Sequence, residues 1–238
     1  MKIGILETGE VADELKRKHG DYPSMFQRLL GAVDPELDYA VYHVTEDQLP
    51  ATVNECDAWL VTGSRHGVYD PLPWIEPLKR FLKDAYQAGV PIVGICFGHQ
   101  ILAEALGGRA TKSDKGWGLG VRSYRVRRRP AWMSGEDSEF SLNALHQDQV
   151  VELPEDAEVL AGSEFCPYAV LAYRGNAMSM QPHPEFQPAY LRDLIEHRRG
   201  SALPDEVADA GLQTLDHPIQ TRQAAEWIVN FLKERLRK

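Results

Sequence analysis

Cys96 lies between two glycines, in the segment Gly-Ile-Cys-Phe-Gly at positions 94–98. The apolar run 90–95 before it predicts a buried strand, and residues 100–106 after it predict a helix that stops at two glycines. A strand, a nucleophile flanked by glycines and a helix form a sharp turn that holds the reactive atom clear of the backbone. The amides of the helix N-terminus favour a thiolate there. The alternative is a buried structural thiol at the end of a core strand.

A histidine and a glutamate that could complete a catalytic triad follow about 90 residues downstream, in Pro-His-Pro-Glu at 182–185. Each proline forces the residue before it out of the helical region, so His183 is expected in extended chain. Residues two apart in such a chain point to the same side, which lets His183 and Glu185 share a face unless a turn at Pro184 intervenes. A thiol, an imidazole and an orienting carboxylate form a nucleophilic triad. Taken alone, His183 would be interpreted as a surface-loop histidine.

The two motifs together, Gly-Ile-Cys-Phe-Gly-His-Gln at 94–100 and His-Pro-Glu at 183–185, resemble those of the class I, or Triad, glutamine amidotransferases. The resemblance covers about residues 1–190. Leu-His-Gln-Asp-Gln-Val at 145–150 is most similar to a loop of the stand-alone glutamine amidotransferase-like proteins and γ-glutamyl peptide hydrolases. The resemblance implies a flavodoxin-like αβα sandwich and a γ-glutamyl amide, either glutamine or a γ-glutamyl peptide, as substrate.

This resemblance implies acyl transfer through a thioester. Cys96 attacks the amide carbon, His183 gives a proton to the departing amine and then activates water, and Glu185 orients the imidazole. The Phe97 amide, next after the nucleophile, is predicted to bind the oxyanion because of the turn geometry. The family likeness of residues 60–67 adds Gly63 or Ser64 as second amide donor, although this loop has fewer glycines and prolines than the family usually shows.

The resemblance also suggests which residues contact the γ-glutamyl group. Gln100 occupies the position of a substrate-binding glutamine, and His146, Gln147 and Asp148 belong to the stretch that lines the pocket. The alternative for Gln100 is a helix-surface amide. His146 and Asp148 could also suggest a metal site, which two ligands support poorly.

Composition excludes several classes of function. The chain has 238 residues, and 26 basic against 35 acidic residues give a net charge of −9, which argues against a nucleic-acid surface. Three widely spaced cysteines indicate neither a disulfide framework nor zinc. No signal peptide, membrane-length apolar run or nucleotide-binding loop is found. We therefore expect a cytoplasmic enzyme without metal or cofactor that binds a small γ-glutamyl molecule and neither nucleic acid nor membrane.

The apolar patterns predict alternating strands and helices around the motifs. Strands are expected at 2–6, 38–44, 57–62, 90–95, 120–127, 139–142, 158–163, 169–173 and 177–181, and helices at 23–31, 73–88, 100–106, 188–199 and 218–236. Alternation predicts an α/β fold whose mostly parallel central sheet is covered by helices on both faces, with the site at the carboxyl ends of strands. Residues 201–216 show no clear pattern.

We interpret residues 1–238 as one domain with a C-terminal helical extension over about 188–238. Ammonia transfer would need a synthase that this chain lacks, which leaves three possibilities. The first is a self-sufficient γ-glutamyl hydrolase. The second is a glutaminase subunit of a separate synthase, and the third is a non-catalytic binding or regulatory protein on the same fold. The intact set of Cys96, His183 and Glu185 argues against the third.

Overall fold

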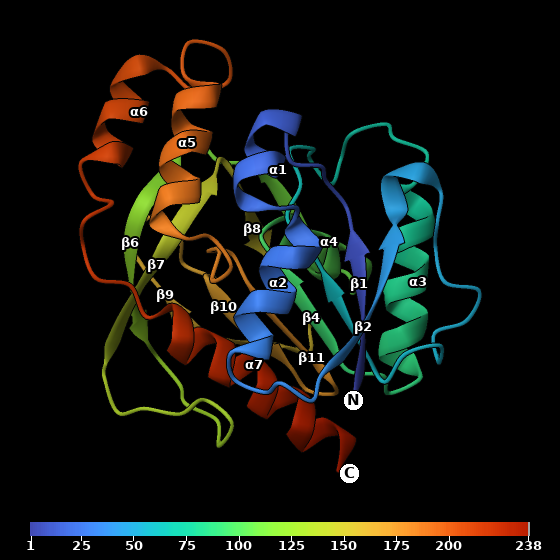
Figure 1. Ribbon diagram of the computed structural model, residues 1–238. Coiled ribbons are helices and arrows are strands. Elements are labelled where there is room, and N and C mark those ends of the chain that lie inside the picture. The colour runs from blue at the N-terminus through green and yellow to red at the C-terminus, as the bar shows by residue number, and fades with distance from the viewer. Residues whose placement is uncertain (238) are drawn as a thin grey trace.

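The computed structural model describes residues 1–237, which form a central mixed sheet with helices on both faces (Figure 1). In the described part of the chain the sheet has nine strands in the order β2-β1-β3-β4-β11-β10-β9-β6-β7. Five pair in parallel: β2 (Asp38–His43), β1 (Lys2–Glu7), β3 (Ala58–Val61), β4 (Ile92–Ile95) and β11 (Ala177–Met180). Four continue it in antiparallel pairing: β10 (Val170–Tyr173), β9 (Ala157–Gly162), β6 (Gly118–Val126) and β7 (Glu139–His146).

Two helices cover each face of the parallel part. On one face lie α2 (Tyr22–Gly31) and α7 (Thr221–Leu236), and on the other α3 (Ile75–Gln87) and α4 (Phe97–Ala105). A third group, α1 (Asp13–His19), α5 (Pro188–Arg198) and α6 (Asp205–Leu212), clusters around a smaller apolar core at one end of the sheet. A 3₁₀ turn, η1 (Val44–Glu46), follows β2, and β5 (Arg109–Lys112) pairs with β8 (Asp148–Glu152) in a small second sheet.

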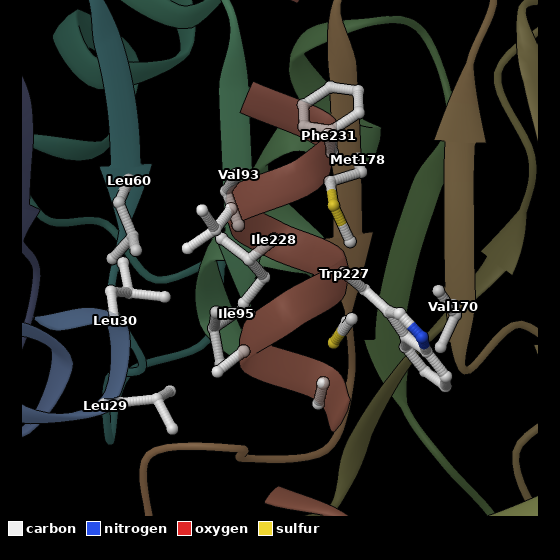
Figure 2. Packing of buried hydrophobic residues seen from close by; sticks show 14 of the residues in the cluster. Leu29, Leu30, Leu60, Val93, Ile95, Val170, Met178, Trp227, Ile228 and Phe231 are labelled. Carbon is white, nitrogen blue, oxygen red and sulfur yellow. The ribbon is translucent and has the colours of Figure 1, made fainter. Parts of the chain in front are cut away.

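An apolar core lies between α7 and the sheet, and it explains why the apolar segments of the sequence form the central strands and the helix that covers them. Figure 2 shows Trp227, Ile228 and Phe231 of α7 facing side chains of β3, β4 and β11. Every residue of β3 and β4 is buried, because helices cover both of their faces, and both strands are therefore continuous apolar runs. Burying an aromatic or aliphatic side chain in such a core stabilises the fold by about 1.5–3 kcal/mol.

The predicted α/β fold is confirmed, and the part of the sheet that carries the candidate site is parallel. Some helix and strand boundaries differ from the predictions. Helix α4 begins at Phe97 instead of residue 100, because the chain turns into the helix within the single residue Cys96. Four helices and strands were missed: α1, α6, β5 and β8. Helix α1 buries only Leu15 and so lacks an apolar stripe, while β8 includes residues interpreted as a pocket loop. Residues 201–216 contain α6.

The strand predicted at 120–127 is β6, which forms a hairpin with β7 and lies second from the edge of the sheet. None of the helices within residues 1–237 combines the length and apolar character that a membrane span requires. The division of residues 1–238 into one domain with a helical extension stays a prediction.

Candidate active site

Cys96 occupies a strained turn between β4 and α4. Its φ of 55° lies in the left-handed region, and its amide donates to the Met180 carbonyl at the end of β11 over 2.8 Å. A Cβ on Gly94 would lie 2.3 Å from the Gly98 carbonyl oxygen, and one on Gly98 would lie 2.4 Å from the Val61 carbonyl oxygen. Only glycine fits at both positions, which is why Cys96 has a glycine two residues before it and another two residues after it. Such local strain is typical of functional sites.

His183 and Glu185 lie side by side after β11, despite a turn at Pro184. The Nδ1 atom of His183 donates to Oε1 of Glu185 over 2.7 Å. The imidazole stacks on Phe186 at a centroid distance of 3.8 Å, and the His183 amide donates to the Asn143 carbonyl over 2.8 Å. At 3% exposure His183 is a buried residue, so the surface-loop alternative is wrong.

The imidazole, the thiol and the loop after β3 meet at one point. A Cβ on Gly63 would lie 2.9 Å from Cε1 of His183 and 3.7 Å from Cβ of Cys96. Because Nδ1 of His183 is hydrogen-bonded to Glu185, Nε2 is the ring nitrogen that remains available to the Cys96 thiol. Burial opposes charge on His183, but Glu185 and Cys96 outweigh it and raise the pKa of His183 to about 10. The imidazole is therefore protonated at neutral pH.

The peptide after Gly63 is held in one orientation by two buried threonines. The Thr62 hydroxyl donates to the Gly63 carbonyl over 3.1 Å, and the Thr8 hydroxyl donates to the Thr62 carbonyl over 3.0 Å. The Thr8 amide in turn donates to the Thr62 hydroxyl over 3.0 Å. In a trans peptide the N–H lies opposite the carbonyl, so the Ser64 N–H points away from the threonines. The Phe97 amide is the first of α4 and has no partner within the helix.

A cavity of about 250 Å³ opens at Cys96, and we call it the inner cavity. Of the predicted residues it brings together Ser64, Cys96, Gln100, His146, Gln147 and Asp148. Its wall also contains residues for which the sequence predicted no role in binding, namely Arg65, His66, Gly67, Tyr69, Asp70, Lys112, Trp117, Leu145 and Arg198. Arg198 ends a helix far along the chain, and no sequence signal pointed to it.

Gln100 and His146 are fixed by the first residue of β8, Asp148. The Gln100 amide donates to the Asp148 carbonyl over 3.0 Å and to Oε1 of Gln181 over 3.1 Å. Gln100 is 3% exposed, so the helix-surface alternative is wrong. Nδ1 of His146 donates to the same Asp148 carbonyl over 3.1 Å, and burial lowers the pKa of His146 to about 4. This ring is neutral at pH 7.

The carboxyl group of Asp148 faces a partly desolvated environment, and burial raises its pKa. The Tyr69 hydroxyl donates to it, which opposes that effect. Across residues 1–237 no three or more His, Cys, Asp and Glu side chains gather where they could hold a metal ion.

The chain belongs to the class I glutamine amidotransferases, since that family's model, "Glutamine amidotransferase class-I", matches residues 26–196. It is similar to γ-glutamyl peptidase 4 of Arabidopsis thaliana, with 28% identity over 92% of this chain and 90% of that protein. It is also similar to the glutamine-hydrolysing GMP synthase of Aquifex aeolicus, with 42% identity over 43% of this chain and 20% of that protein. The chain also resembles the solved structure of a glutamine amidotransferase from Thermotoga maritima, with a TM-score of 0.76 and 17% identity. The match covers 99% of this chain and 97% of the Thermotoga chain, which shows the shared fold.

Proposed function

We propose that this protein hydrolyses a γ-glutamyl amide through a thioester on Cys96, with His183 and Glu185 completing the triad. One observation carries the proposal: a buried imidazole, bonded through Nδ1 to a carboxylate, lies beside a cysteine that opens into a cavity. The same three side chains argue against the non-catalytic alternative. The matched family acts on glutamine, which supplies the acyl group.

In the first half-reaction the Cys96 sulfur attacks the γ-carbonyl carbon. The C–N bond breaks as Nε2 of His183 gives its proton to the departing nitrogen, and a thioester remains. A protonated His183 at neutral pH suits this role. Water then loses a proton to the neutral His183 and attacks the thioester, and glutamate is released with regeneration of the thiolate.

Both half-reactions pass through an oxyanion that needs hydrogen-bond donors. We assign these to the amides of Phe97 and Ser64. The Phe97 amide is an unpaired helix N-terminal donor. The Thr62 hydroxyl, which accepts from the Thr8 amide, holds the Gly63 carbonyl on the side away from the Ser64 amide. Of the two candidates in this loop, this geometry favours Ser64 over Gly63. One such donor contributes roughly 3 kcal/mol of transition-state stabilisation.

The γ-glutamyl amino and carboxylate groups require polar partners in the inner cavity. We propose Gln100, His146, Gln147 and Asp148, whose side chains or backbone line it beyond Cys96. A self-sufficient hydrolase is supported by the γ-glutamyl peptidase relative, which aligns over nearly the whole chain. The alternative, a glutaminase subunit of a separate synthase, is supported by the GMP synthase relative over less than half of it.

The direct test compares three cysteine variants. Cys96→Ala should abolish release of glutamate from glutamine and from γ-glutamyl peptides, whereas Cys56→Ala and Cys166→Ala should keep it, because both of those thiols lie outside the cavity. A glutamine-analogue alkylator should label wild-type protein once, at Cys96. Normal turnover by Cys96→Ala would rule the mechanism out.

A further inference from the structure

A second cavity, of about 580 Å³, adjoins the inner one, and we call it the outer cavity. The two share the side chains of Arg65, His66, Trp117 and Arg198, which form their common wall. Ammonia is about the size of water, which occupies roughly 30 Å³. Glutamine hydrolysis alone therefore requires no space of this size beside the nucleophile.

The outer cavity lies on the histidine side of the nucleophile. Its wall includes Tyr22 and Tyr190. Both rings pack on Phe186, at centroid distances of 6.1 and 4.8 Å, and Phe186 stacks on His183. Because His183 protonates the leaving nitrogen, the leaving group must depart on this side. The γ-glutamyl group then occupies the opposite side, toward Gln100.

Two cations on the common wall are free to bind an anion. Within residues 1–237 the guanidinium groups of Arg65 and Arg198 have no ion-pair partner. The neighbouring Arg199, by contrast, pairs with Glu196 and Asp209. Tyr22 lines the outer cavity together with Arg198, and it stacks on Phe186, the ring that contacts His183.

The charges in the outer cavity differ along its length. Glu10 and Asp13 line it but do not reach the inner cavity, whereas Arg65 and Arg198 lie where the two cavities meet. When a γ-glutamyl peptide is bound, the α-carboxylate of its second residue is only two bonds from the scissile nitrogen. That carboxylate would therefore lie at the arginine end, and an apolar side chain would extend over Tyr22, Tyr190 and Leu194.

We propose that the outer cavity binds the leaving amino acid of a γ-glutamyl dipeptide, with Arg65 and Arg198 holding its α-carboxylate. This rests on the proposed function and specifies the substrate class of the same site. Guanidinium groups bind carboxylates through paired, charge-assisted hydrogen bonds, which neutral amides cannot replace.

Binding to Cys96→Ala protein, which keeps its ligand uncleaved, separates this proposal from hydrolysis. We would measure by calorimetry the Kd of γ-glutamyl-leucine, of γ-glutamyl-leucinamide, which lacks the carboxylate, and of glutamine. The acid should bind at least about tenfold more tightly than the amide. Adding Arg198→Gln or Arg65→Gln should reduce that preference. Adding Arg192→Gln should not, because Arg192 lies on α5 outside both cavities.

Two results would overturn the assignment. The first is no preference for the acid in the Cys96→Ala protein, including failure of both peptides to bind. The second is an equal loss of affinity for glutamine and both peptides with Arg198→Gln, which would mean that the arginine holds the γ-glutamyl carboxylate. If the acid is preferred but wild-type protein cleaves no γ-glutamyl compound, the hydrolase proposal fails while the cavity assignment stands.

Discussion

Replacing Gly63 by alanine should damage catalysis because the new methyl group would push against His183, the histidine of the proposed triad. The new Cβ would lie 2.9 Å from Cε1 of His183, whereas ordinary contacts begin near 3.4 Å, so a shift of about 0.5 Å is required. The ring has little freedom to give way, because it stacks on Phe186 and is bonded to Glu185. Since a misplacement of about 1 Å can cost about 100-fold in rate, we expect kcat/KM to fall by about 10- to 100-fold.

The same clash should lower stability by about 1–3 kcal/mol, as overpacking commonly does. Urea unfolding of Gly63→Ala, His183→Ala and the double variant forms a cycle that isolates the contact. In the absence of the His183 side chain, Gly63→Ala should cost much less. Gly31→Ala is the matched control, because a Cβ there has no neighbour within 4 Å. It should leave activity unchanged and stabilise α2 by up to about 1 kcal/mol.

Either of two results would refute this reasoning: wild-type kcat/KM for Gly63→Ala, or the same loss of stability whether or not His183 is present. A fall in activity without any coupling in the stability cycle would also count against a steric cause. The substitution would then be acting on the backbone of the loop that we propose binds the oxyanion, instead of on the imidazole.

Three further predictions follow from burial and charge. In NMR titrations the His183 ring should titrate near pH 10, and Cys96→Ala should lower that pKa because Cys96 is among the groups that raise it; an unchanged value would contradict this contribution of Cys96. Burial lowers the pKa of His99 to about 3 and that of His146 to about 4. In the unfolded chain a histidine has a pKa near 6.5, so below that pH the unfolded state binds more protons than the folded state. As the pH falls toward the folded pKa, each histidine should therefore lower the free energy of unfolding by about 1.4 kcal/mol per pH unit. His99→Asn should make the free energy of urea unfolding less sensitive to acid. Trp227→Ala should cost about 3–5 kcal/mol in urea unfolding because the indole is buried against the sheet, while Arg222→Ala, exposed on the same helix, should cost less than about 1 kcal/mol.

Most of the sheet and its covering helices followed from the sequence because burial imposes a pattern. Strands β3 and β4 are buried on both faces and therefore appear as unbroken apolar runs. Helix α3 alternates buried and exposed residues with helical spacing. Elements without such a pattern were missed: α1 buries one residue, and β5 is a short strand of mostly polar residues held by pairing with β8.

The sequence alone determined the chemical identity of the site, since the glycines around Cys96 and the prolines around His183 constrain the chain locally. What only the tertiary structure decided depends on contacts between distant segments. The β4–β11 pairing brings Cys96 to His183, the Thr8–Thr62 contact orients the Ser64 amide, and the end of α5 delivers Arg198 to the cavity wall. No local pattern encodes these contacts, because packing of the whole sheet and its helices sets their distances.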